Sequence, residues 1–192
     1  MTTATTASPK KVFTGVVRAS YVNVFNTKFN DLSGKDEYSL MILIPKKDKE
    51  TVSKIKKAID FAREGKWKDK TPKGFSTTFK DGDDEEHLPE AVEVGDEPYT
   101  GHYFMNLKTS TKPGIVDRNL DKIIDESTFR SGDYCRISIM AFAYDQKGNR
   151  GISFALHNIQ VLKKGEPLGG QSRAEDDFDV VDEDDDDMDF LD

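Results

Sequence analysis

The run YCRISIMAFAY, residues 134–144, alternates between two chemically different faces, and it constrains the fold more than any other segment. The face with small apolar side chains carries Cys135, Ile137, Ile139, Ala141 and Ala143, and the other face carries Tyr134, Arg136, Ser138, Met140, Phe142 and Tyr144. A period of two residues is typical of a β-strand with one face in a core. The segment therefore predicts a core strand whose second face is available to solvent or to a ligand.

Four further segments are rich in β-branched and aromatic residues and predict strands. They are residues 11–25, with a bend at Gly15, and residues 38–44, 101–111 and 151–162. In the third of these, Tyr103, Met105 and Leu107 fall on one side of the strand. A turn at residues 146–149 joins the last two strands into a hairpin.

Helical spacing occurs in one segment, which follows the second predicted strand. Asp48 is a suitable N-cap, Gly65 is a suitable C-terminal stop, and apolar residues recur between them at spacings of three and four. These are Val52, Ile55, Ala58, Ile59 and Ala62. The sequence therefore predicts one amphipathic helix, followed by a long charged loop over residues 66–98.

This order of elements predicts a mainly β fold. Strands that do not alternate with helices argue against a parallel, doubly wound sheet. We expect a five-stranded, OB-fold-like antiparallel barrel with one amphipathic helix and long loops. The expected domain occupies residues 11–170, after a disordered lead-in of residues 1–10.

The segment from 171 to 192 has a charge pattern unlike that of the rest of the chain. It carries a net charge of −11, whereas residues 1–170 total +3. Such a block of like charge is expected to remain disordered. Phe190 and Leu191 nevertheless interrupt it close to the end. Two interpretations stay open: a solvated charge run, or a mobile arm that competes with an acidic polymer and offers an acidic-aromatic peptide to partners.

Several classes of protein are not supported by the sequence. It has no apolar run of about 18 residues, so a membrane span is not expected, and the N-terminus does not resemble a secretory signal. The single cysteine, Cys135, excludes an internal disulfide and a cysteine-based zinc site. We expect a cytoplasmic protein without a cofactor. The acidic run at residues 81–86 lacks the spacing of a calcium loop, which favours a solvated loop over a magnesium or calcium site.

Two predicted strands combine cations with aromatic rings on their second faces. These candidate DNA-binding residues are Arg136, Phe142 and Tyr144 on one strand and His102, Phe104 and Lys108 on another. Single-stranded nucleic acid requires this mixture, because cations neutralise phosphates and exposed rings stack on bases. The alternative is that the rings form a second core face under the helix or the long loop. Trp67, between two lysines, is either a nucleic-acid contact or a plug for the barrel mouth.

Six pieces of the sequence, taken in order, resemble one known family. They are YVNVF (21–25), YSLMILIPKKD (38–48), FKDGDDEE (79–86), YTGHYFMNLKTSTKPGIVD (99–117), FRSGDYCRISIMAFAYDQKGNRGISFALHNIQVLKKGEPLGG (129–170) and the acidic-aromatic tail. This combination resembles tailed-bacteriophage single-stranded-DNA-binding proteins, formerly classed as a domain of unknown function.

The resemblance implies a non-enzymatic OB-fold protein that coats single-stranded DNA in phage replication, recombination and repair. It also implies that the acidic tail occupies the DNA groove when DNA is absent and docks on replication proteins. The corresponding tail residues are Asp189, Phe190 and Leu191, with the departure that Leu191 and Asp192 follow the ring. The family resemblance also allows a homodimer. Two other function classes remain open: an acidic-tail interaction module or chaperone for a basic partner, and a metal-dependent nuclease.

Overall fold

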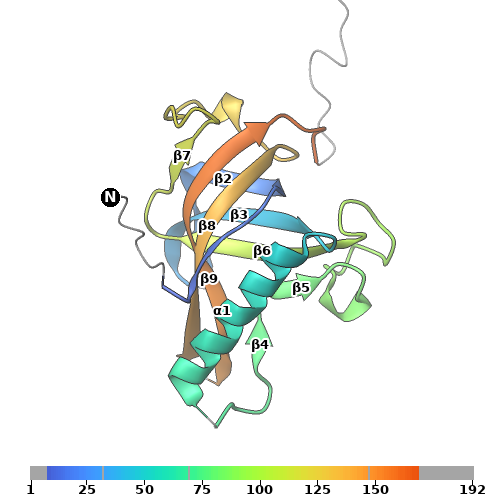
Figure 1. Ribbon diagram of the computed structural model, residues 1–192, viewed down its shortest axis with the longest axis vertical. Helices are drawn as coiled ribbons and strands as arrows, with labels where there is room; N and C mark the ends of the chain where they lie inside the picture. The colour runs from blue at the N-terminus through green and yellow to red at the C-terminus, as the bar shows by residue number, and fades with distance from the viewer. Residues whose placement is uncertain (1–7, 32, 69, 147, 169–192) are drawn as a thin grey trace, which may run out of the picture.

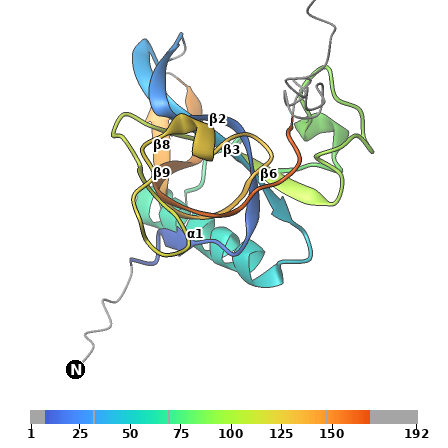
Figure 2. The ribbon, with the colours of Figure 1, turned by 90° about the horizontal axis from the view of Figure 1, so that it is seen from above.

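The computed structural model describes residues 8–31, 33–68, 70–146 and 148–168. Its five long strands are β2 (Val17–Asn30), β3 (Lys35–Pro45), β6 (His102–Thr109), β8 (Tyr134–Gln146) and β9 (Asn149–Lys163). They pair in the order β8-β2-β3-β6-β9, and β9 pairs again with β8, so the strands form a closed ring (Figures 1 and 2). The predicted fold class, a mainly β, OB-fold-like arrangement of five strands, is confirmed.

One pair in the ring departs from the antiparallel arrangement. β6 and β9 run parallel where Lys108 lies opposite Ala155, whereas the other pairs of the ring are antiparallel. The inward faces match the predicted alternation, because Met105, Leu107 and Ile139 are fully buried. These side chains belong to the main hydrophobic core, which fills the ring.

The first predicted strand is divided into two. β1 (Lys11–Phe13) pairs with β8, and β2 begins four residues later at Val17. Gly15 lies in the bend, as predicted, and its N–H donates to the Thr51 Oγ1 at 2.7 Å. A Cβ at this position would overlap the Asp48 carboxylate, which explains why the bend requires glycine.

The helix α1 (Lys49–Trp67) lies against β1, β8 and β9 (Figure 1). Its N-cap is the predicted Asp48, whose carboxylate accepts a hydrogen bond from the Thr51 N–H at 3.0 Å. The predicted apolar stripe is buried against the main core. Gly65 does not end the helix; the helix continues to Trp67, and Lys68 caps it with a φ of 50°.

The long predicted loop is partly structured. It contains β4 (Ser76–Thr77), β5 (Phe79–Asp81) and the 3-10 helix η1 (Glu85–His87), while β7 (Gly114–Val116) and η2 (Glu126–Thr128) occur later in the chain. Residues 88–99 pack outside the ring on a second apolar cluster, formed by Met41, Leu43, Tyr99 and Phe104. This cluster covers part of the outer surface of β3 and β6.

The proposed tail segment, 171–192, and most of the lead-in, 1–10, lie outside the described residues. The same holds for Asp189, Phe190 and Leu191. Within the described ranges, no helix is long and apolar enough to span a membrane.

Candidate nucleic-acid interface

The outward side chains of β2, β3 and β6 form one continuous surface, which we call the outer face. The strand register sets it, since Asn23 lies opposite Ser39 and Ser39 lies opposite Lys108. The Asn23 Nδ2 donates to the Ser39 Oγ at 3.4 Å, so β2 and β3 are also linked by their side chains. The outer face comprises Tyr21, Asn23, Lys28, Ser39, Asn106 and Lys108, whereas Phe29, which lies opposite Asp36, points to the other side of the β2–β3 hairpin.

Two aromatic rings on β2 are exposed, Tyr21 at the outer face and Phe29 on the other side of the β2–β3 hairpin. Tyr21 is 67% exposed and Phe29 is 64% exposed. Tyr21 has a φ of 46° and lies in an irregularity of the β2–β3 register between Ser20 and Asn23. A non-glycine residue with positive φ is uncommon, and bulges often re-aim a side chain beside a functional site. The backbone therefore presents the Tyr21 ring to solvent at an energetic cost.

Two lysines of the outer face lie near the β2–β3 hairpin. Lys28 and Lys108 line a cleft of about 270 Å³ at the β2–β3 hairpin, together with Phe29 and Ser39. The acidic Glu37 also lines the cleft, but its Oε2 accepts hydrogen bonds from the Asn30 Nδ2 at 2.5 Å and the Ser33 Oγ at 3.1 Å. The cleft therefore combines two lysines with two acidic residues, Asp31 and Glu37, of which the glutamate accepts hydrogen bonds from neighbouring side chains.

The floor beside this surface is the second apolar cluster. Phe104, predicted as a stacking ring, is only 3% exposed, and its ring packs edge-on against Tyr99 at a centroid distance of 5.1 Å. The prediction of a stacking role for Phe104 is therefore corrected: the ring lies under the segment that follows η1. Burial raises the pKa of Tyr99, and the nearby Tyr21 contributes to the same shift.

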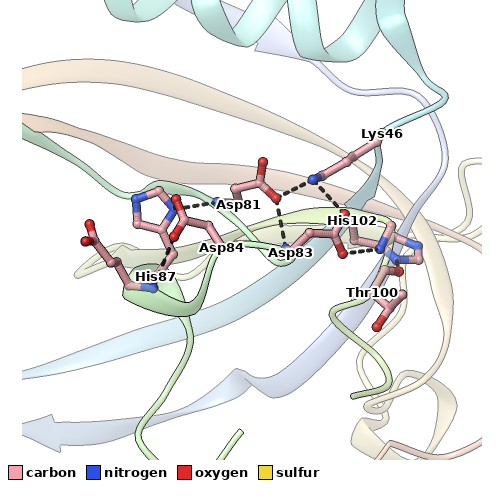
Figure 3. A network of polar contacts seen from close by, with 9 residues as sticks. Lys46, Asp81, Asp83, Asp84, His87, Thr100 and His102 are labelled. Atoms are coloured by element: carbon pink, nitrogen blue, oxygen red, sulfur yellow. Dashed lines mark hydrogen bonds and ion pairs between the residues drawn. The ribbon is translucent and has the colours of Figure 1, made fainter. Parts of the chain in front are cut away.

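A polar network fastens the segment that covers this cluster (Figure 3). The Lys46 ammonium forms ion pairs with Asp81 and, at 2.7 Å, with Asp83. The other Asp83 oxygen accepts the Gly101 N–H at 2.9 Å. Burial lowers the Lys46 pKa, but its bonds to the two aspartates outweigh this and raise it overall. The Asp83 pKa is lowered by its hydrogen bonds with Lys46 and Gly101.

Three residues singled out from the sequence, His102, Asp81 and Asp83, lie in or next to this network. His102 is half-buried, and its Nδ1 lies 2.7 Å from the Thr100 carbonyl oxygen, so the ring holds the turn before β6. Asp81 and Asp83 have Lys46 as their counter-ion. No group of three or more metal-ligating side chains occurs in the described ranges.

The predicted residues of β8 lie on a different part of the ring. The Arg136 Nη2 donates to the Gln160 Oε1 on β9 at 2.6 Å, and the Tyr144 hydroxyl lies 3.0 Å from the Ser76 Oγ on β4. Phe142 is 43% exposed. In the ring, β9 separates β8 from β6 on one side, and β2 and β3 separate them on the other. The two candidate sets therefore lie on strands separated by β9, where Ala155 lies opposite both Lys108 of β6 and Met140 of β8.

Trp67 belongs to the hydrophobic interior rather than to an open surface. It is half-buried, packs against the main core, and meets Phe75 edge-on at 5.8 Å. Of the two interpretations drawn from the sequence, a plug and a nucleic-acid contact, this packing favours the plug.

Sequence reasoning missed Tyr21, Lys28 and Phe29. From the sequence, Asn30, Asp31 and Gly34 predict a turn region over residues 26–35, which contains Lys28 and Phe29. The structure extends β2 through it to Asn30. The signal that was available is the pair Lys28-Phe29, a cation next to a ring.

Comparisons with known proteins agree on one group. The family model described as the single-stranded-DNA-binding protein of Enterobacter phage Enc34 matches residues 10–191. A search of curated protein sequences gives no significant match.

Solved structures show the same fold. The single-stranded-DNA-binding protein from bacteriophage Enc34 in complex with single-stranded DNA is 22% identical, with a TM-score of 0.68 over 83% of this chain and 90% of that one. A C-terminal truncation of the same phage protein is 20% identical, with a TM-score of 0.68 over 83% and 89%. The single-stranded-DNA-binding protein gp2.5 of bacteriophage T7 is 16% identical, with a TM-score of 0.59 over 91% and 96%.

Proposed function

The chain belongs to the family of the single-stranded-DNA-binding protein of Enterobacter phage Enc34, and on this premise we propose that it binds single-stranded DNA along the outer face. The observation that carries the proposal is the exposed Tyr21 ring at the outer face, which also presents Lys28 from β2 and Lys108 from β6. Each base stacked on a ring contributes about 1–3 kcal/mol and tolerates any sequence. The lysines neutralise phosphates and make the affinity depend on salt.

The sequence-predicted residues have unequal parts in this proposal. Lys108 lines the cleft and contacts phosphate. His102 shapes the turn before β6 and Phe104 packs beneath the surface, so both act by supporting it. Phe142 and Tyr144 extend the path only if DNA continues onto the β8–β9 hairpin. Arg136 on β8 pairs with Gln160 on β9 and donates a hydrogen bond to its side chain, so we do not include Arg136 among the residues that contact DNA.

The acidic tail masks the outer face when DNA is absent. Two facts support this part of the proposal: the tail carries −11 against +3 for residues 1–170, and Leu168 packs on the second apolar cluster. Arg18 helps to hold this exit point, because its Nη2 donates to the Glu166 carbonyl at 2.9 Å. The tail therefore begins next to the surface that DNA would occupy.

Phe190, Leu191 and Asp189 dock on replication proteins once DNA has displaced the tail. In this account the protein acts without catalysis in phage replication, recombination and repair, in the host cytoplasm, and a homodimer is compatible with it.

The test is fluorescence-anisotropy titration of labelled oligo-dT and of a duplex of the same length with the full chain, over a salt series with and without magnesium. We expect the protein to bind the single strand more tightly than the duplex. We also expect the logarithm of the binding constant to fall linearly with the logarithm of the salt concentration. Equal affinity for both DNAs would overturn the proposal. Cleavage of the labelled oligonucleotide in the presence of magnesium would instead support the nuclease hypothesis.

A further inference from the structure

A second surface feature lies on the part of the ring where β8 and β9 pair. It is a groove of about 340 Å³ on the outer side of these strands, between β1 and the loop after β7. We call it the β8–β9 groove. The residues that line this groove include Phe13, Val116, Leu120, Arg136, Ser138 and Gln160.

The two walls of the groove are apolar and exposed. Phe13 from β1 is 54% exposed, and Leu120 from the loop after β7 is 71% exposed. Leu120 has a φ of 71°, a conformation that leucine rarely adopts. The Asp117 Oδ1 fixes the loop by accepting the N–H groups of Asn119 at 2.7 Å and Asp121 at 2.9 Å. The loop thus holds an aliphatic side chain in solvent beside a phenyl ring, an arrangement that favours contact with an apolar partner.

Cations lie between and beside these walls. The Arg136 guanidinium lines the groove and is oriented by its bond to Gln160, whose Nε2 in turn donates to the Asp117 carbonyl at 3.2 Å. The Lys11 ammonium lies 5.2 Å from the centroid of the Phe13 ring. The groove therefore suits a peptide that carries both apolar side chains and carboxylates.

We propose that the β8–β9 groove binds the C-terminal tip of the same chain, residues 188–192. This tip, MDFLD, places Phe190 and Leu191 between Asp189 and Asp192 and ends in the chain's own carboxylate. The apolar pair matches the Phe13 and Leu120 walls. The carboxylates match Arg136 and Lys11.

The tail is long enough for this contact. Residues 169–192 follow Leu168, and a flexible chain of this length has a root-mean-square end-to-end distance of roughly 27 Å. The Leu168 N–H donates to the Ser131 carbonyl at 3.4 Å, and Ser131 precedes Arg136 by five residues, which span at most about 18 Å. The start of the tail and the groove therefore lie within the reach of one relaxed tail.

The same geometry argues against DNA as the occupant. A base stacks on a ring, but one of the two walls is an aliphatic leucine, and Arg136 is the one cation among the described lining residues. The outer face offers the exposed Tyr21 ring with two lysines. Binding of the tip here would leave the acidic stretch before it free to cross the outer face, and would withhold Phe190 from protein partners.

The test uses the full chain and amide NMR spectra without DNA. The double variant Phe190→Ala/Leu191→Ala is compared with Val180→Ala/Val181→Ala, which removes a similar amount of apolar surface in the middle of the tail. We expect the tip variant alone to shift the signals of Val116, Leu120 and Ser138. Unchanged signals at these three residues would overturn the proposal, whatever happens at Tyr21, whose signal reports tail masking of the outer face.

A reciprocal variant tests the groove itself. Leu120→Asn removes the apolar wall while keeping a residue that tolerates positive φ, and Ile124→Asn, at a site 79% exposed but outside the groove, is its control. We expect Leu120→Asn alone to move the Phe190 and Leu191 signals to random-coil positions. The proposal fails if neither variant moves the Phe190 and Leu191 signals. It also fails if the shift of these signals disappears on dilution, because that would indicate binding between two copies of the chain. Finally, it fails if oligo-dT shifts the groove signals of the tip variant, because DNA would then be the occupant.

Discussion

At the scale of single residues, the proposed DNA binding depends on a ring that remains in water. Tyr21 lies at the outer face without a ring partner among the described contacts, whereas Phe104 and Trp67 each pack against another ring. Alternation along a strand predicts which way a side chain points. It does not predict whether a distant segment covers that side chain, as the segment containing Tyr99 covers Phe104.

Replacing the exposed ring of the outer face should weaken DNA binding without unfolding the protein. We expect Tyr21→Ala to reduce oligo-dT affinity by about 5- to 150-fold, the equivalent of 1–3 kcal/mol for one stacked base, and Phe29→Ala, whose ring points to the other side of the β2–β3 hairpin, to reduce it less. Fluorescence titration at fixed salt measures the change. Phe61→Ala, which removes a ring 44% exposed on α1, is the matched control and should bind like the parent chain. Equal losses for all three variants would contradict the role of the outer face.

Cys135 gives a prediction about pH. Its side chain is fully buried, and burial raises the pKa of the thiol to about 12. The unfolded chain releases the thiol proton near the ordinary pKa of 9.0, whereas the folded state keeps it up to about pH 12. The free energy of unfolding is therefore unaffected by this thiol below about pH 9 and falls as pH rises from 9 toward 12. Thiol titration at pH 8 should label Cys135 only in denaturant; rapid labelling of the native protein would contradict the burial.

At the scale of elements, the ion pairs of Lys46 connect the end of β3 to β5 and to the turn before β6. We expect Lys46→Met to speed hydrogen exchange at residues 82–101, because Asp81 and Asp83 lose their counter-ion. Lys47→Met, at the exposed neighbour, is the control. Since the Asp83 pKa is lowered from 3.8, the parent's protection should weaken only as pH falls below that value. Unchanged exchange in Lys46→Met would show that apolar packing alone holds the segment.

The crossing of residues 165–168 over the turn before β8 depends on glycine. Gly132 has a φ of 106°, and a Cβ there would overlap the Glu166 carbonyl oxygen. Gly95 has a similar φ of 103° with no neighbour within 4 Å, so Gly95→Ala measures backbone strain alone. Gly132→Ala should therefore lower the free energy of unfolding by about 1–3 kcal/mol more than Gly95→Ala, measured by urea denaturation. Equal effects would mean that residues 165–168 are not held against the turn.

Local patterns predicted most elements, because alternation and helical spacing depend on neighbouring residues. Four of the five predicted strands, the Gly15 bend and the Asp48 cap are where the sequence indicates them, whereas the first predicted strand is divided at the bend and extends to Asn30. The predicted end of α1 at Gly65 was wrong, because Gly65 stays helical and the helix continues to Trp67. The parallel contact of β6 with β9 and the cover over Phe104 join segments far apart in the chain, so local patterns could not reveal them.

At the scale of the whole molecule, the C-terminal segment and the rest of the chain carry net charges of opposite sign. The segment 171–192 carries −11 and residues 1–170 carry +3. In the proposed account, DNA competes with the tail for the outer face. The competition is strongest at low ionic strength, where the Debye length is long.

Removing the tail should therefore raise DNA affinity in a salt-dependent way. We expect residues 1–170 to bind oligo-dT at least about tenfold more tightly than the full chain at 10–50 mM salt, with the difference shrinking toward 0.5 M as screening weakens the tail. Parallel titrations of both proteins measure it. A tail that only solubilises the protein would leave the two affinities equal at every salt concentration.

The central claim is that single-stranded DNA lies on the outer face of β2, β3 and β6. Its most direct test is an amide NMR titration of the full chain with short oligo-dT, followed residue by residue. We predict that the largest shifts occur at Tyr21, Asn23, Lys28 and Lys108. Shifts concentrated instead at Arg136, Phe142 and Tyr144 on β8, with the outer face unchanged, would contradict the account.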